Sequence, residues 1–190
     1  MAIHNELSGY WRPSKEDLAA AVGNSIPDVV APALKVLFCG INPGLWSGAV
    51  GHHFARPGNR FWKVLEAAGL TDRLLSPFED EKLISFGLGV TNLVARATRS
   101  AEDLTDEELR LGVERMERES ARFAPRFVAF LGIGAYRTAF QRQRATVGEQ
   151  PECLGGSRLW LLPNPSGLQA RYQLPELAEA FGALRRASFG

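Results

Sequence analysis

Four short apolar segments are spaced along the chain, and stretches with helical periodicity separate them. The segments are 35–39, 89–94, 127–131 and 159–162, and glycine or proline follows three of them at once. Continuous rather than alternating hydrophobicity is typical of strands buried on both faces, as in a parallel sheet. The pattern therefore predicts four buried strands.

Between these strands the apolar residues recur every three or four positions. The clearest case is 106–123, where Leu109, Val113, Met116 and Phe123 form one stripe; shorter helices are predicted at 60–68, 135–142 and 174–186. Strands that alternate with helices predict an α/β fold of three layers, α/β/α, around a central four-stranded, mostly parallel sheet. Ligands of such sheets bind at the carboxyl ends of the strands.

The first residues have a different character. Ser14 and Asp17 predict a capped helix over 15–22 that ends before Gly23. We therefore expect 1–27 to be an N-terminal extension with a short helix, and 28–190 to be one domain, since 190 residues is an ordinary domain size.

Composition narrows the class of protein. Apolar residues make up 45 % and charged residues 23 %, as in globular domains. No apolar run is long enough for a transmembrane helix, and Pro13 interrupts a mixed-charge N-terminus that does not resemble a signal peptide, so we expect a cytoplasmic protein without membrane contact. Only Cys39 and Cys153 are present, which excludes a disulfide scaffold, a four-cysteine zinc site and an iron–sulfur cluster within the chain.

The net charge of +1 conceals an uneven distribution. Eighteen of the 22 basic residues are arginine, which suits bidentate phosphate or base contacts. No carboxylate occurs in 29–65, 82–101 or 153–175. We therefore expect one positively charged surface in spite of the balanced total.

Two Asn-Pro turns lie within these acid-free windows, each just after a predicted strand. The first loop reads Gly-Ile-Asn-Pro-Gly at 40–44, and the second reads Asn-Pro-Ser-Gly-Leu at 164–168. Neither has the spacing of a dinucleotide-binding fingerprint or the lysine of a P-loop. Two rigid turns at one sheet edge indicate a site rather than simple connections.

These segments, with FARPGNRFW at 54–62 and GVTNLV at 89–94, resemble in order the motifs of the mismatch-specific uracil-DNA glycosylase and thymine-DNA glycosylase family. The resemblance covers roughly 28–186. It implies a monofunctional DNA repair glycosylase that flips uracil, or related damaged pyrimidines such as ethenocytosine, out of duplex DNA. Hydrolysis of the N-glycosidic bond opposite guanine would leave an abasic site. The implied enzyme is a monomer that acts on double-stranded DNA with G·U mismatches and needs no metal or organic cofactor.

The resemblance also assigns residues to the base pocket. Asn42 is the implied catalytic residue, and Phe54 would stack on the flipped base. Ser47 would crowd a 5-methyl group and disfavour thymine. The remaining pocket residues are Gly40, Ile41, Gly44 and Asn92. Asp103 follows the loop after a strand, so it is either an auxiliary base for water or a capping acid of the next helix.

A second group is implied to contact DNA. Leu168 would be the apolar wedge that fills the gap left by the flipped base, and Gly167 would let the backbone approach the unpaired guanine. Gln169 stands where a serine is common, which leaves the reading of the opposite base open. The other expected DNA contacts are Asn164, Ser166, Arg171, Arg96 and Arg99.

Other interpretations compete with this one. A non-catalytic module for damaged or single-stranded nucleic acid would use the same charges and a stacking phenylalanine. An α/β hydrolase with Ser47 or Ser166 as nucleophile fits poorly, because no G-x-S-x-G elbow occurs. Superfamily branches with an iron–sulfur cluster need more cysteines, and branches with a catalytic aspartate are disfavoured by Asn42. His52 and His53 alone are a weak metal signal, and we expect them to contact a loop or a phosphate.

Overall fold

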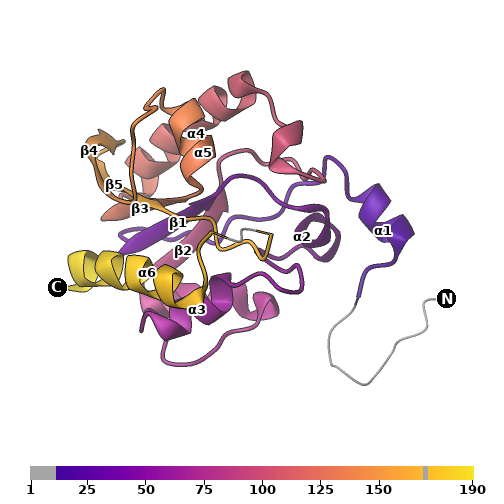
Figure 1. The fold of residues 1–190 in the computed structure, drawn as a ribbon, viewed down its shortest axis with the longest axis horizontal. Helices are drawn as coiled ribbons and strands as arrows, with labels where there is room; N and C mark the ends of the chain where they lie inside the picture. Colours follow the sequence, from indigo (N-terminus) through magenta and orange to yellow (C-terminus); the bar gives the residue numbers. More distant parts are fainter. Residues whose placement is uncertain (1–11, 169–170) are drawn as a thin grey trace.

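The computed structural model describes residues 12–168 and 171–190 of the chain. A single five-stranded sheet runs through it (Figure 1). In the spatial order β2-β1-β3-β5-β4, the strands are Leu88–Asn92, Val36–Gly40, Phe127–Leu131, Ser157–Leu162 and Gly148–Leu154. The first four are parallel and β4 is antiparallel to β5. The predicted α/β fold is confirmed, but the strand count of four was one too low.

The missed strand β4 does not have the hydrophobicity of the others. Its residues alternate between half-buried and exposed positions, it contains Pro151, and its pairing with β5 is irregular between Glu149 and Cys153. Proline is tolerated at a sheet edge, where an N–H need not pair. A hairpin through Gly155 and Gly156, both at positive φ, joins β4 to β5.

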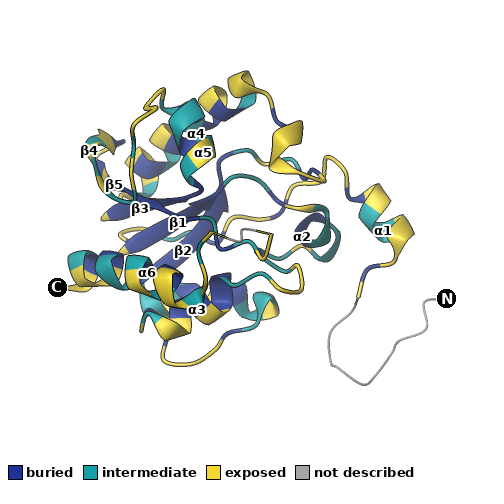
Figure 2. Ribbon diagram, viewed as in Figure 1, coloured by how far each residue is buried: buried dark blue, intermediate teal, exposed yellow. Residues whose placement is uncertain are grey.

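Helices cover both faces of the sheet, which gives the three predicted layers (Figures 1 and 2). Val36 and Phe38 of β1 belong to the core on one face, with α3 (Phe61–Ala67), α6 (Leu174–Phe189) and the 3-10 segment η1 (Pro77–Phe86). Leu37 and Cys39 belong to the opposite core, with α4 (Asp106–Phe123) and α5 (Ile133–Ala139). Because successive side chains of a strand point to opposite faces, one apolar run serves both cores.

Shorter elements gather near the carboxyl ends of the strands: α1 (Lys15–Ala20), α2 (Leu45–Val50) and the 3-10 turn η2 (Ala101–Asp103). Ser14 and Asp17 form the predicted capping box of α1. The segment after α1 is tied to the loop that follows β2, since the Gly23 N–H donates to the Ala97 carbonyl over 2.9 Å. Among the described residues, no helix is long and apolar enough to cross a membrane.

Phe181 of α6 offers a test of the packing. Its ring is fully buried and stacks on Phe38 of β1 with centroids 5.7 Å apart. We predict that Phe181→Ala lowers the free energy of unfolding by about 3–5 kcal/mol, because a large buried ring leaves a cavity. Urea or thermal denaturation measures the change. Phe189→Ala, at an exposed position of the same helix, is the control; equal stability losses in the two variants would contradict this packing.

Candidate active site

The loops after β1 and β2 are joined by several hydrogen bonds. Gly40 and Asn92 are register partners at the ends of the two strands. Beyond them, the Leu93 N–H donates to the Gly40 carbonyl over 2.8 Å, and the Val94 N–H donates to the Ile41 carbonyl over 2.9 Å. The parallel register therefore brings the first and third sequence motifs together at one edge of the sheet.

Asn42 is held by its amide nitrogen. The half-buried Nδ2 donates to the Arg96 carbonyl over 3.0 Å and to Thr98 Oγ1 over 2.7 Å. Both acceptors lie in the loop after β2, whose Thr98 N–H donates in turn to the Pro43 carbonyl. With both amide protons used in this way, Oδ1 is the atom with which Asn42 can accept a hydrogen bond from water.

The end of β1 has no room for a side chain. A Cβ on Gly40 would lie 2.6 Å from Asn92 Oδ1 and 3.4 Å from the ring of Phe54. Asn92 is 5 % exposed, so its amide lies within the domain. Glycine at this position lets a phenyl ring and a buried amide approach the same stretch of backbone.

Phe54 is held in an unusual conformation. Its φ is +52°, in the left-handed region that non-glycine residues rarely adopt. Its ring stacks on Phe61 at a centroid distance of 4.1 Å. Buried Ser47 of α2 accepts a hydrogen bond through Oγ from the Ala55 N–H over 3.1 Å. Ser47 thus fixes the turn that carries Phe54, and strain of this kind persists only where the surroundings enforce it.

The two adjacent histidines occupy different surroundings. His52 Nδ1 lies 3.1 Å from a carboxylate oxygen of Asp80 on η1, and that carboxylate also accepts from the His53 N–H over 3.3 Å. His53 is 1 % exposed, and its Nε2 lies 2.9 Å from the Pro27 carbonyl. A phosphate contact is therefore excluded for His53. The sequence alone does not show that His52 and His53 have different partners.

The loop with the second Asn-Pro turn is tightly organised. Asn164 Oδ1 accepts from the Ser166 N–H over 3.0 Å, and Ser166 Oγ accepts from the Leu168 N–H over 3.4 Å. Leu168 is 73 % exposed, the largest exposed fraction among the large apolar side chains of the described residues. The turn therefore presents an apolar side chain to solvent on a well-defined backbone.

Arg60 fastens this loop to the one that carries Phe54. Its guanidinium donates to the carbonyls of Pro165, Ser166 and Tyr172 over 3.3, 2.7 and 2.5 Å. A Cβ on Gly167 would lie 2.5 Å from the Gly58 carbonyl, so these backbones are close together. The role of Arg60 was missed, although it lies within the segment 54–62 that carries the resemblance.

The remaining candidate residues differ in whether their side chains already bond to other groups of the protein. Arg96 forms a bidentate pair with Glu108, with a shortest distance of 2.5 Å, which lowers the pKa of that carboxyl to about 2. Asp103 is exposed and accepts from the Ser100 N–H over 3.0 Å as a cap of η2. Arg99 and Arg171 are exposed, and Gln169 lies outside the described residues. The functional roles of these residues stay predictions.

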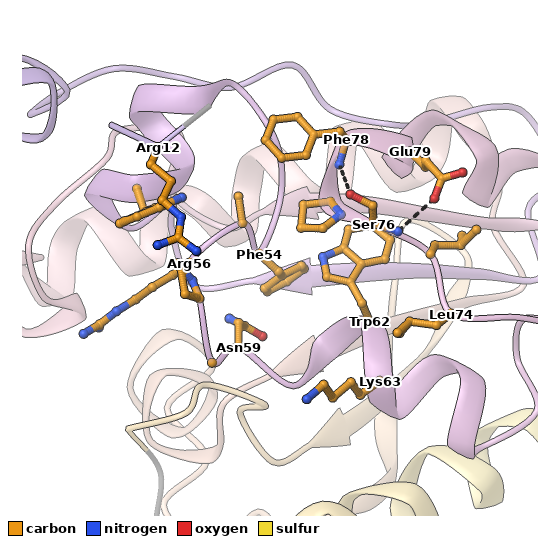
Figure 3. Close-up of a pocket in the computed structure, with 16 residues that line it drawn as sticks. Arg12, Phe54, Arg56, Asn59, Trp62, Lys63, Leu74, Ser76, Phe78 and Glu79 are labelled. Atoms are coloured by element: carbon orange, nitrogen blue, oxygen red, sulfur yellow. Dashed lines mark hydrogen bonds between the residues drawn. The ribbon is translucent and has the colours of Figure 1, made fainter. Parts of the chain in front are cut away.

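Two hollows flank these loops. One, of about 480 Å³, is lined by Phe54, Trp62 and basic side chains that include Arg12 and Arg56; Figure 3 shows Phe54 between Trp62 and this arginine pair. Neither Asn42 nor Asn92 lines it.

The other hollow, of about 940 Å³, lies at the ends of β1, β3 and β5. Ile41, Asn164 and Arg171 line it together, which joins residues of both Asn-Pro motifs. Gly132, at φ +133° before α5, also lines it and was not singled out from the sequence. The acidic Glu102 shares this lining, so the predicted positive surface is interrupted here.

Comparison with known proteins shows the family to which the chain belongs. The family model of the uracil DNA glycosylase superfamily matches residues 27–185, and the chain belongs to that superfamily, whose members are DNA glycosylases. The fold is similar to the solution NMR structure of a protein from Methanosarcina acetivorans that is provisionally described as a uracil DNA glycosylase. The TM-score is 0.60 at 20 % identity, over 87 % of this chain and 98 % of that one. That likeness supports the fold.

Gly40 allows a direct test of the close approach of Asn92 and Phe54 to the end of β1. We predict that Gly40→Ala slows the release of uracil from duplex DNA by at least about tenfold, because the added methyl group displaces the Asn92 amide or the Phe54 ring. Single-turnover cleavage measures the rate, and thermal denaturation checks folding. Gly182→Ala on α6, where a Cβ meets only ordinary contacts, is the control. A Gly40→Ala rate within twofold of wild type would rule out this close approach as a requirement.

Proposed function

We propose that this protein removes uracil from double-stranded DNA, preferentially opposite guanine, by hydrolysis of the N-glycosidic bond. The observation that carries the proposal is the meeting of Phe54, Asn92 and Gly40 beside the anchored amide of Asn42. A ring face for stacking and a buried amide for hydrogen bonding suit a planar base with polar edges. Membership of a family of DNA glycosylases supports this substrate class.

The chemistry proposed for Asn42 is limited by its functional group. Cleavage of a glycosidic bond passes through an oxocarbenium-like transition state, to which water adds at C1′. Asn42 Oδ1 would accept a hydrogen bond from that water and orient it. An amide cannot take up the proton as a carboxylate would, so the reaction depends on stabilising the departing uracil anion with hydrogen-bond donors. We therefore expect slow turnover.

The same amide supports a monofunctional enzyme. Asn42 has no amine with which to form a covalent bond to C1′, so the expected product is an abasic site on an unbroken strand. Ethenocytosine and related adducts are proposed as further substrates. The auxiliary role of Asp103 stays a proposal; it requires its carboxylate to leave the Ser100 cap.

The loop at 163–168 supports base flipping in a duplex. A base extruded from the stack leaves a gap, and an apolar side chain that fills it is a recurrent device. Leu168 is exposed at 73 %, on a loop that Arg60 fastens to the segment of Phe54. We propose that Leu168 enters the stack while the base enters the pocket, with Asn164, Ser166 and Arg171 on the DNA backbone and Gly167 and Gln169 near the unpaired guanine.

Replacement of Asn42 tests the catalytic assignment. We predict that Asn42→Ala lowers the single-turnover rate on G·U duplex by about 100-fold or more, because the water loses its orienting acceptor. Alkali-labile abasic sites are counted for G·U, A·U, G·T and single-stranded uracil. G·U is expected to react fastest.

The matched control is Thr98→Val, which removes one tether of the Asn42 amide and leaves the amide itself. It should lose less activity than Asn42→Ala, because the amide keeps its hydrogen bond to the Arg96 carbonyl. Undiminished G·U cleavage by Asn42→Ala would refute the role of the amide. Binding of uracil-containing duplex by wild type with no abasic product would instead favour a non-catalytic module.

Replacement of Leu168 tests the wedge. We predict that Leu168→Ala lowers cleavage of duplex G·U by about tenfold and affects single-stranded uracil much less, since the wedge offsets part of the cost of unstacking a base. Leu111→Ala on α4 removes another exposed leucine and is the control. Equal losses on duplex and single strand would count against insertion.

A further inference from the structure

His53 has one defined tautomer. Its Nε2 lies 2.9 Å from the Pro27 carbonyl oxygen, which can only accept a hydrogen bond. The proton of the neutral imidazole is therefore on Nε2, and Nδ1 is left as an acceptor. His53 is 1 % exposed, so water does not compete for this nitrogen.

That acceptor faces the amide of Asn92. Asn92 Nδ2 lies 3.4 Å from His53 Nδ1, so the amide nitrogen is the donor of this pair. The amide oxygen lies toward the end of β1, where a Cβ on Gly40 would meet it. The backbone carbonyl of Asn92 accepts from Arg115 of α4, which fixes the main chain as well. The side chain of Asn92 thus has one favoured orientation of its amide.

The orientation of the amide matters because it decides the order in which a hydrogen-bond donor and an acceptor are presented to a base. One proton of Nδ2 is used by His53, and the edge left over carries one acceptor, Oδ1, beside one donor, the second N–H. Uracil presents the complement, a donor at N3 and an acceptor at O4. Cytosine presents the reverse, an acceptor at N3 and a donor at N4. A 180° rotation of the amide would exchange these preferences.

We propose that His53 is a positioning residue that holds the Asn92 amide in the orientation that accepts uracil and rejects cytosine. The inference rests on the proposed function, since it names how that pocket selects its base. Neutral His53 supports the uracil pattern. Protonated His53 carries a proton on Nδ1, cannot accept from Asn92 Nδ2, and favours the rotated amide.

The surroundings of His53 determine the pH at which it becomes protonated. Burial lowers the pKa of His53 below its ordinary value, and the Pro27 carbonyl and the carboxylates of Asp80 and Asp28 oppose that shift. His52 lowers the pKa further, and Arg115 of α4 pairs with Asp28 at 3.4 Å. The proton is therefore taken up only below about pH 6.5. Uracil cleavage is expected to be intact above this pH and to fall as the pH drops through the lowered pKa.

Two variants distinguish a role of His53 in orienting the Asn92 amide from a role in packing alone. His53→Gln can donate to Pro27 through Nε2 and accept from Asn92 through Oε1, and it does not titrate. His53→Phe keeps the ring and removes both nitrogens. Single-turnover rates are measured between pH 5 and 8 on duplexes with uracil or cytosine opposite thymine, where neither base has a Watson–Crick partner, and on G·U.

At pH 7.5 we expect His53→Gln to remain within about threefold of wild type and to lack the acid loss that wild type shows. His53→Phe should lose about tenfold on uracil, the scale of one hydrogen bond, and its preference for uracil over cytosine should narrow. If His53→Gln lost activity at low pH as wild type does, the proposal would be overturned. It would also be overturned if folded His53→Phe kept the wild-type preference for uracil over cytosine. If His53→Phe fails to fold in thermal denaturation, the two pH profiles of wild type and His53→Gln decide. Absence of abasic product from wild type on G·U would be a failure of the proposed function itself.

Discussion

The lack of a side chain at the end of β1 is the constraint on which the site depends. Gly40 ends the interior strand β1, which has a parallel neighbour on each side. Any Cβ there would collide with Asn92 Oδ1. The parallel register sets Asn92 opposite Gly40, and the strained turn at Phe54 brings its ring to the same point. Three segments far apart in sequence meet because one of them ends in glycine.

The side-chain amides of Asn42 and Asn92 are held in fixed orientations by their neighbours. Neither Asn42 nor Asn92 is charged, and each relies on fixed orientation. The Asn42 amide donates to Arg96 and Thr98, the Asn92 amide lies against His53 Nδ1, and Arg115 donates to the backbone carbonyl of Asn92. A neutral hydrogen bond contributes only about 1 kcal/mol to stability, but a misdirected amide offers the wrong pattern to a ligand. Orientation therefore matters more here than interaction strength.

The fold was largely predictable because its signals are local. The stripe of α4 has the helical period and an N-terminal capping box at Thr105 and Glu108, and its predicted bounds match the structure. Four strands were continuous apolar runs. β4 was missed because an exposed edge strand with Pro151 has no such run. The two Asn-Pro turns lie at the same edge of the sheet, as predicted.

The supporting contacts of the site were less predictable, because they depend on long-range geometry. Nothing local distinguishes His53 from His52, yet one is buried against Pro27 and Asn92 while the other pairs with Asp80. Arg60 acts on carbonyls more than a hundred residues away in the sequence. Such contacts follow from the register of the sheet and the packing of loops, which composition and spacing do not encode.

Analysis of the products of a G·U duplex tests the central claim most directly. Mass spectrometry should show free uracil and an unbroken strand with an abasic sugar, since water adds at C1′ as the base departs. Free uracil with a cleaved strand would contradict hydrolysis by an amide-oriented water. Absence of any released base would contradict the enzyme activity as a whole.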